Sequence, residues 1–312
     1  MIPSEKLTHP SPLVSVIMPA HNREHSLSES IQSVINQTYQ HWELLVIDDR
    51  STDGTARVVQ SLANTDERIR YLKNENKQGP AGARNWGITH ANGSYISFLD
   101  SDDLWLPHHL NECLSVLTVE DKKFCSAKWY EKKGTEITPS GFVGCVDYLM
   151  KTFSENKGNS NNYVFGPEIF EYLIVRDFYP FHISTVVVHK EVLERVCLFN
   201  EKLFGPEDSD LLFKIVLEYG LCIINNFHSI WVQGEDNIHF FKNSTQDFEK
   251  QTLPKVLKNR LNHLILFKEQ IRLIRANCHK LSDANRLIHL KRFEIAFNCF
   301  YLRHTKSEWL SH

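Results

Sequence analysis

The chain has 312 residues, of which 42% are hydrophobic and 23% are charged, and its formal net charge at pH 7 is -3. These proportions are those of a globular protein with a buried core, and they exclude an intrinsically disordered chain. Neither a basic block nor an RNA-binding aromatic motif is present, so nucleic acid is not expected as a partner. The length fits two typical domains, or one large α/β domain with a helical addition.

Cysteine usage and hydropathy favour a reduced protein without membrane spans. The seven cysteines are odd in number and scattered, and they form no C-x-x-C pair that could hold zinc. The first twelve residues, MIPSEKLTHPSP, do not resemble a secretory signal, and no stretch approaches the ~20 apolar residues of a membrane span. We therefore expect a cytoplasmic protein with free thiols, either soluble or peripheral at the inner face of the cell membrane.

The first hundred residues alternate between short apolar runs and amphipathic segments. Four apolar runs are predicted to be strands: residues 14–18, 43–47, 70–72 and 95–99. A helix is predicted over residues 26–35, where Ser26 and Glu29 form a capping box, and further helical segments follow the next two strands. The order β-α-β-α-β-α-β predicts a parallel, twisted sheet with helices on both faces. Ligands of such sheets gather at the carboxyl ends of the strands.

The second half of the chain is less regular. From about residue 116 the pattern loosens into loops, which is typical of a variable, substrate-facing half, before a predicted strand at 184–189 and a helix over 208–219. Beyond about residue 246 apolar residues lie near helical spacing, and basic residues outnumber acidic ones. The favoured interpretation is a helical appendage packed on the body with a solvated face. A docking surface for anionic membrane lipids is the alternative.

Three carboxylates follow the apolar run that ends at Leu99. In an extended segment, residues two apart point the same way, so Asp100 and Asp102 can converge on one point, with Asp103 beside them. Carboxylates without thiols or clustered imidazoles suit Mg²⁺ or Mn²⁺, which typically binds one or two carboxylates plus substrate phosphate oxygens. This pattern predicts a diphosphate-binding metal site with Asp102 and Asp100 as ligands. The alternative is a loop of helix-capping aspartates before Pro107.

Five motifs resemble, in the same order, those of glycosyltransferase family 2, whose members invert configuration and have the GT-A fold. They are VSVIMPAHN at 14–22, VIDDRSTDGT at 46–55, GARN at 82–85, FLDSDD at 98–103 and GPED at 205–208. The resemblance runs from about residue 14 to residue 237 and is densest up to residue 105. It implies metal-assisted sugar transfer from a nucleotide diphosphate donor. Transfer of a single sugar is favoured, because the Q/R-x-x-R-W pattern of processive members is missing.

The resemblance also implies a donor site at the ends of the first strands. The residues implied in donor binding are Pro19, Ala20, His21, Asn22, Asp49, Arg84, Asp100 and Ser101. Asp49 and the 19–22 loop would hold the base and ribose, where a carboxylate can accept a uracil imide N–H, and Arg84 would approach the diphosphate. The alternatives are turn capping for Asp49 and a helix-surface charge for Arg84. Most members carry glycine where this chain has Arg50, so the backbone of that turn can differ locally.

A catalytic base is implied at the fifth motif. Proline followed by acids is a helix-start pattern, so Glu207 and Asp208 should lie in the first turn, where the helix dipole favours an ionised carboxylate. By resemblance, Asp208 would take the proton of the acceptor hydroxyl as that oxygen attacks the anomeric carbon, and Glu207 would assist positioning or bind acceptor. Asp210 is a weaker substitute. His239 is a further candidate metal ligand, although an ordinary loop histidine is the simpler interpretation.

The sequence therefore predicts a GT-A-type α/β domain over residues 10–240, divided near residue 115 into nucleotide-binding and acceptor-binding halves. A helical C-terminal segment over residues 241–312 should follow. The expected cofactor is Mn²⁺ or Mg²⁺, and the expected partners are a nucleotide-sugar donor, with UDP favoured, and a saccharide or lipid-linked acceptor of surface-glycan synthesis. An inactive nucleotide-sugar binding module and a nucleotidyltransferase are the alternatives. The second normally has a glycine-rich loop after the first strand, which this chain lacks.

Overall fold

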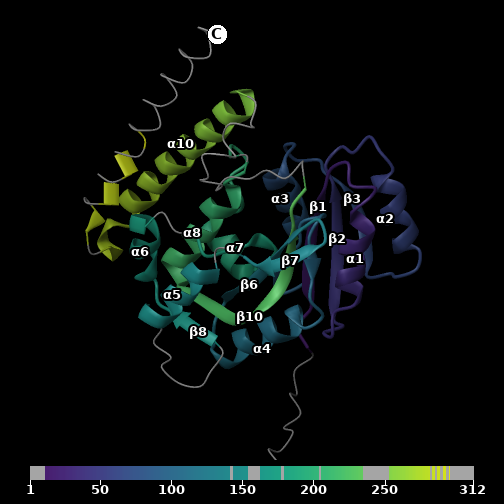
Figure 1. Cartoon of the computed structure of the whole chain (residues 1–312), viewed down its shortest axis with the longest axis horizontal. Helices are drawn as coiled ribbons and strands as arrows, with labels where there is room; N and C mark the ends of the chain where they lie inside the picture. Colours follow the sequence, from purple (N-terminus) through teal and green to yellow (C-terminus); the bar gives the residue numbers. More distant parts are fainter. Residues whose placement is uncertain are drawn as a thin grey trace, which may run out of the picture.

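The computed structural model describes residues 11–140, 143–153, 162–176, 179–203, 205–234 and 253–281, with a few positions up to 295. Within these residues, ten strands form one sheet that is covered by helices on both faces (Figure 1). The strands are β1 (Val14–Ala20), β2 (Trp42–Asp48), β3 (Ile69–Lys73), β4 (Tyr95–Phe98), β5 (Leu104–Trp105), β6 (Phe124–Lys133), β7 (Glu136–Pro139), β8 (Asn162–Phe165), β9 (Val187–His189) and β10 (Leu221–Val232). The α-helices are α1 (Leu27–Ile35), α2 (Thr55–Ala63), α3 (Pro80–His90), α4 (His109–Val119), α5 (Val143–Phe153), α6 (Ile169–Arg176), α7 (Lys190–Val196), α8 (Glu207–Tyr219) and α10 (Leu253–Ala276).

The strand order is β3-β2-β1-β4-β9-β6-β10-β5, with β7 paired to β6 and β8 paired to β10. The first four strands in this order are parallel, which confirms the β-α-β prediction for the first hundred residues. β9 is antiparallel to both β4 and β6 and joins the two halves of the sheet. The strand expected from residue 184 begins later, at Val187, because Ile183–Thr185 forms a 3₁₀ turn.

Alternation along the strands explains why their apolar runs are continuous. In β1, Val14, Val16 and Met18 belong to one buried cluster, whereas Ile17 belongs to a second cluster. Successive side chains of a strand point to opposite faces, so the two clusters lie on opposite sides of the sheet. A strand that is buried on both faces needs apolar residues at nearly every position.

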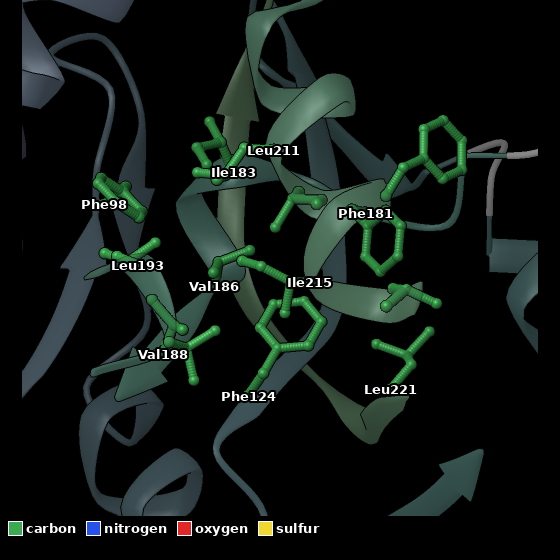
Figure 2. Close-up of a cluster of buried hydrophobic side chains, with 14 of the residues drawn as sticks. Phe98, Phe124, Phe181, Ile183, Val186, Val188, Leu193, Leu211, Ile215 and Leu221 are labelled. Carbon is green, nitrogen blue, oxygen red and sulfur yellow. The ribbon is translucent and has the colours of Figure 1, made fainter. Parts of the chain in front are cut away.

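Helices complete the two cores. α1, α2 and α4 contribute to the cluster that contains Val14, while α3, α6, α7 and α8 contribute to the cluster that contains Ile17. Figure 2 shows part of the second cluster, where Leu211 and Ile215 of α8 lie with Phe124 of β6 and Val188 of β9. This packing holds α8 against the middle of the sheet.

The start of α1 differs from the prediction in one contact. α1 is present, but the Ser26 side chain makes no capping hydrogen bond to the helix. Its Oγ instead donates to the carbonyl oxygen of Ser101, at 3.1 Å. Ser26 therefore ties the start of α1 to the aspartate-rich loop after β4.

The C-terminal helix packs on the body. Ile274 of α10 is 0% exposed and lies in the same buried cluster as Leu211 of α8, and Leu287 also joins this cluster. The predicted boundary near residue 241 lies outside the described residues. Among the described helices, none combines the length and apolarity that crossing a membrane requires.

Candidate active site

The loops after β1, β2 and β4 meet at the carboxyl edge of the parallel strands. The amide of Asp49 donates to the carbonyl of Ala20 at 2.7 Å, and the amide of Leu99 donates to the carbonyl of Ile17 at 3.1 Å. These bonds continue the sheet beyond the assigned strands. The predicted donor-binding segments, Pro19 to Asn22, Asp49 and Asp100 to Ser101, are thereby brought together.

Asp49 is the most enclosed residue of the first two loops. Its side chain accepts from Asn74 Nδ2 at 2.6 Å and from the Gly79 amide at 2.7 Å, and the residue is 6% exposed. Gly79 immediately precedes α3, so Asp49 fixes the start of that helix against β2. Turn capping, the alternative from the sequence, is not its observed contact. Its carboxylate instead accepts a hydrogen bond from the Gly79 amide, at the start of α3.

His21 and Asn22 form the exposed lip of the site. His21 Nδ1 lies 2.8 Å from the carbonyl oxygen of Asp49, and Asn22 Oδ1 accepts from the Thr52 amide at 2.8 Å. Asn22 has a φ of 51°, and Arg50, on the facing turn, has a φ of 66°. Arg50 thus adopts the left-handed conformation that glycine adopts most readily, which carries a local energetic cost.

Arg84 joins two of the predicted motifs. Its guanidinium donates to Asp100 Oδ1 at 2.7 Å and to Glu207 Oε1 at 2.8 Å, and the residue is 3% exposed. Burial opposes its charge, yet the carboxylates of Asp100 and Glu207 raise the pKa of Arg84 above its ordinary value. The alternative of a helix-surface charge is therefore wrong. Arg84 is a buried ionic bridge between the β4 loop and the start of α8.

The aspartate-rich loop is a turn and not the extended segment that was predicted. The Asp103 amide donates to the carbonyl of Asp100 at 3.0 Å, which closes the turn. Asp102 lies 3.2 Å from Arg23, and burial, followed by the charge of Asp100, raises the pKa of Asp102 to about 6. Asp100 and Asp102 therefore do lie close enough to repel each other, although a turn and not strand alternation brings them together.

Asp103 has a different role from its neighbours. It is fully buried and accepts from Ser184 Oγ at 2.7 Å and from the Val232 amide at 3.2 Å. Burial, followed by the charges of Asp102 and Asp100, raises the pKa of the Asp103 carboxyl group. These contacts anchor the loop to β10 and leave Asp100 and Asp102 as the two carboxylates at the rim.

The donor set at the rim fits a hard divalent cation. Asp100 and Asp102 offer carboxylate oxygens, and burial, followed by the charge of Asp100, raises the pKa of Asp102, so a cation at this position would stabilise its ionised form. Arg23, which sequence reasoning missed, now partly balances that charge. His239, the third candidate ligand, lies outside the described residues.

Asp208 and Glu207 begin α8, as the sequence predicted. Glu207 is 3% exposed, and its carboxylate accepts from Arg84 and from the Gly205 amide, at 2.6 Å for the amide. These contacts favour positioning over acceptor binding. Asp208 is partly exposed, and its carboxylate accepts from the Ser209 amide at 2.6 Å. Asp210, the substitute candidate, is buried and paired with Lys214 at 2.6 Å.

The charge state of Asp208 corrects one expectation. The helix start was expected to favour the ionised form. Burial, followed by the neighbouring charge of Glu207, instead raises the pKa of Asp208 to about 7. A carboxyl group with such a pKa is ionised about half the time at neutral pH and accepts a proton more readily than an ordinary aspartate.

Comparisons with known proteins find similarity to glycosyltransferases. The model of "Glycosyl transferase family 2" matches residues 15–169. A glucosyltransferase of Escherichia coli, UDP-Glc:alpha-D-GlcNAc-diphosphoundecaprenol beta-1,3-glucosyltransferase WfgD, is 48% identical over 112 residues, which are 36% of this chain and 44% of that protein. The GalNAc(5)-diNAcBac-PP-undecaprenol beta-1,3-glucosyltransferase of Campylobacter jejuni is 46% identical over 154 residues, covering 46% of this chain and 49% of that protein. The chain thus matches about half the length of these relatives.

Solved structures share the fold at lower identity. S. aureus TarS 1-349 in complex with UDP-GlcNAc has a TM-score of 0.61 at 17% identity, covering 95% of this chain and 91% of that chain. The mannosyltransferase PcManGT from Pyrobaculum calidifontis, in complex with GDP-Man and Mn²⁺, has a TM-score of 0.57 at 19% identity, with 95% and 75% covered. The predicted GT-A type of α/β fold is confirmed by these likenesses.

Proposed function

Residues 15–169 belong to glycosyl transferase family 2, and on that premise we propose that this protein is an inverting glycosyltransferase. It moves one sugar from a nucleotide diphosphate donor, with a UDP-sugar favoured, to a hydroxyl of a saccharide or lipid-linked acceptor. The observation that carries the proposal is the buried bridge of Arg84, which links the Asp100 loop to the helix start that bears Asp208.

Different parts of the site have different roles in this proposal. In this proposal the 19–22 loop and Asp49, which are hydrogen-bonded to each other, would hold the nucleoside, and Asp100 with Asp102 would hold Mn²⁺ or Mg²⁺. When bound, the cation would neutralise the donor diphosphate and stabilise its departure. Ser101, whose carbonyl accepts from Ser26, keeps the carboxylate loop in place beside the donor.

Asp208 supplies the proton acceptor. Its ionised carboxylate removes the proton of the acceptor hydroxyl while that oxygen attacks the anomeric carbon opposite the departing nucleoside diphosphate. Because attack and departure occur on opposite faces, the configuration is inverted. Arg84 and Glu207 act as positioning residues, since both are buried and form an ion pair with each other.

The first experiment is a donor panel on the full chain, with a lipid-diphosphate-linked saccharide as acceptor. We would begin with UDP-glucose, because the two curated relatives are named as glucosyltransferases of lipid-linked acceptors. The expected result is release of nucleoside diphosphate from one donor, with Mn²⁺ and not with chelator. Pyrophosphate release from a nucleoside triphosphate would favour the nucleotidyltransferase. Donor binding without release across donors and acceptors would favour the binding module.

Two substitutions test the assigned roles. Asp208→Asn should lower the transfer rate by about 10²- to 10⁴-fold while UDP binding stays within about twofold, because a base is lost with little change of shape. Asp102→Ala should weaken UDP binding with Mn²⁺ but not with chelator. Isothermal titration and initial rates measure both.

The matched control is Glu218→Gln, which also removes a charge from α8 but lies on the exposed side against Lys280. Its transfer rate should equal that of the native protein. Normal turnover by Asp208→Asn would remove the base assignment, and unchanged Mn²⁺-dependent affinity of Asp102→Ala would remove the metal assignment.

A further inference from the structure

Two histidines and a cysteine meet in the buried layer between α4 and β10. His109 and Cys113 lie one turn apart on α4, and His228 lies on β10, which runs beside α4 (Figure 1). All three residues are 0% exposed. Each offers one ligand atom, and these atoms lie within 4.8 Å of one another. None of the three takes part in the candidate active site.

The triangle formed by these atoms has the dimensions of a zinc site. The two Nδ1 atoms of His109 and His228 are 3.1 Å apart, and Cys113 Sγ lies 3.6 Å from each. Tetrahedral zinc, with Zn–N near 2.0 to 2.1 Å and Zn–S near 2.3 Å, places its nitrogens about 3.3 Å apart and nitrogen about 3.6 Å from sulfur. The three atoms therefore match one face of a zinc tetrahedron.

The outer contacts of His228 set the direction of its free lone pair. His228 Nε2 lies 2.9 Å from a carboxylate oxygen of Glu112, so this nitrogen carries the hydrogen and Nδ1 is left as an acceptor. A ligand histidine typically donates its other ring N–H to a carboxylate in this way. Glu112 would therefore orient His228 toward a metal.

The outer contact of His109 likewise places the ring hydrogen on Nε2 and leaves Nδ1 as the acceptor. His109 Nε2 lies 3.5 Å from Ser97 Oγ, and that hydroxyl donates to the Val186 carbonyl at 2.8 Å, so it can only accept from the ring. Both Nδ1 lone pairs then face each other at 3.1 Å. Two facing lone pairs repel unless a cation or a proton lies between them.

A second arrangement of ligands is less suitable. His108, Glu112 and His228 also lie close together. However, His108 Nε2 lies 2.9 Å from the Phe227 carbonyl oxygen, so this nitrogen donates and has no lone pair to offer. The inner set of His109, Cys113 and His228 is the one whose lone pairs are free.

We propose that His109, Cys113 and His228 bind a structural zinc ion that fastens α4 to β10. These side chains supply three of the four ligands of a tetrahedral zinc ion. The Cys113 thiolate would offset one of the two positive charges of Zn²⁺, and the two imidazoles would bind as neutral ligands. Nitrogen and sulfur ligands also separate this site from the oxygen ligands of Asp100 and Asp102.

The zinc would restrain the segment that follows the aspartate-rich loop. β5 follows that loop, and its Trp105 pairs with Ser229, the neighbour of His228. Asp103 of the loop accepts from the Val232 amide farther along β10. An ion that fixes β10 to α4 therefore fixes both ends of the segment that leads from Asp103 into α4.

The test uses the full chain, purified without a polyhistidine tag, and measures metal content and the spectrum after cobalt substitution. We expect about one zinc ion per chain and a thiolate-to-cobalt charge-transfer band, which carboxylate ligands cannot produce. Cys113→Ser and His109→Asn should reduce the zinc content to less than about a tenth of that value. The controls Cys222→Ser, a buried cysteine of β10, and His108→Asn, the adjacent histidine, should keep it.

Several outcomes would overturn the proposal. One is folded native protein that takes up no zinc and shows no thiolate band with cobalt. Another is a zinc content that survives His109→Asn and is lost in His108→Asn. Should the ligand variants not fold, the native protein still decides: a chelator should lower its melting temperature by several degrees and zinc should restore it, while Mg²⁺ should not. An unchanged melting temperature and zinc content after chelation under partly denaturing conditions would also count against the site.

Discussion

At the residue scale, the carboxyl group of Asp208 determines the pH range in which the proposed reaction can run. Burial, followed by Glu207, raises the pKa of Asp208 to about 7. Only the ionised form accepts a proton, so the competent fraction falls about tenfold per pH unit below that value. We expect kcat/KM for transfer to rise with pH through an apparent pKa of about 7 and to level off above it, as measured by initial rates at saturating Mn²⁺.

The carboxyl group of Asp102 could produce a similar pH dependence, which has to be distinguished from that of Asp208. The pKa of Asp102 is raised to about 6, so loss of the metal would also lower activity in acid. Mn²⁺-dependent UDP binding at the same pH values reports on the metal site and not on Asp208. A kcat/KM profile that is flat, or that follows the binding profile, would contradict the role of Asp208.

Arg84 offers a test of the buried bridge. Removing its side chain leaves Glu207 buried without its ionic partner, which should cost about 3 to 5 kcal/mol of unfolding free energy. Arg195→Ala is the matched control, because that side chain is 66% exposed and pairs with Glu191 across one helical turn. Its loss should cost at most about 1 kcal/mol. Equal costs in denaturant unfolding would show that the bridge does not stabilise the fold.

Sequence patterns located these residues but could not assign their partners. Strand-end reasoning placed Asp49, Asp100 and Asp102 at one edge of the sheet, because the carboxyl ends of parallel strands coincide. The pairing of Arg84 with Glu207 spans 123 positions and depends on how α8 packs. The same is true of Cys113 and His228, which are 115 positions apart and match no short zinc motif.

At the element scale, the start of α3 is held by a close backbone contact. A Cβ atom at Gly82 would lie 1.8 Å from the carbonyl oxygen of Lys77. Gly82→Ala must therefore displace the loop that precedes Gly79, whose amide donates to Asp49. We expect a loss of about 1 to 3 kcal/mol in unfolding free energy and weaker UDP binding, measured by denaturant unfolding and titration.

Gly144 in α5 is the matched control for this substitution. It is exposed, and a Cβ atom there would meet nothing within 4 Å. Gly144→Ala should stabilise the protein by about 0.5 to 1 kcal/mol, because alanine loses less backbone entropy in a helix. If both variants had the same unfolding free energy, the close contact between Gly82 and Lys77 would not affect stability.

Local patterns predicted most of the elements in the first hundred residues and fewer of their ends. Helical spacing found α1, yet Ser26 uses its hydroxyl on Ser101 and not on the helix. The apolar run from residue 184 contains a 3₁₀ turn before β9, since Ser184 bonds to Asp103 and leaves the strand direction. In both places a tertiary contact replaces the local hydrogen bond that the sequence favours.

At the scale of the whole molecule, the C-terminal helix belongs to the core of the body. Ile274 of α10 lies in the cluster that includes Leu211 of α8, the helix that begins with Glu207 and Asp208. The favoured interpretation from the sequence, a helical appendage packed on the body, is confirmed for α10 by this shared cluster. The packing makes the position of Asp208 dependent on residues more than sixty positions away.

Ile274→Ala tests this dependence. The side chain is 0% exposed, so its truncation should cost about 2 to 5 kcal/mol. Because α8 and α10 share one cluster, we expect a single transition in which tryptophan fluorescence and helical circular dichroism change together. Five of the six tryptophans lie between residues 42 and 231, so fluorescence reports on the body.

The control is Ile137→Ala on β7, where the side chain is half exposed, and it should change stability by about 0.5 kcal/mol at most. A loss of helical signal that precedes the fluorescence change would mean that the C-terminal helix unfolds independently, and Asp208 would then not depend on it.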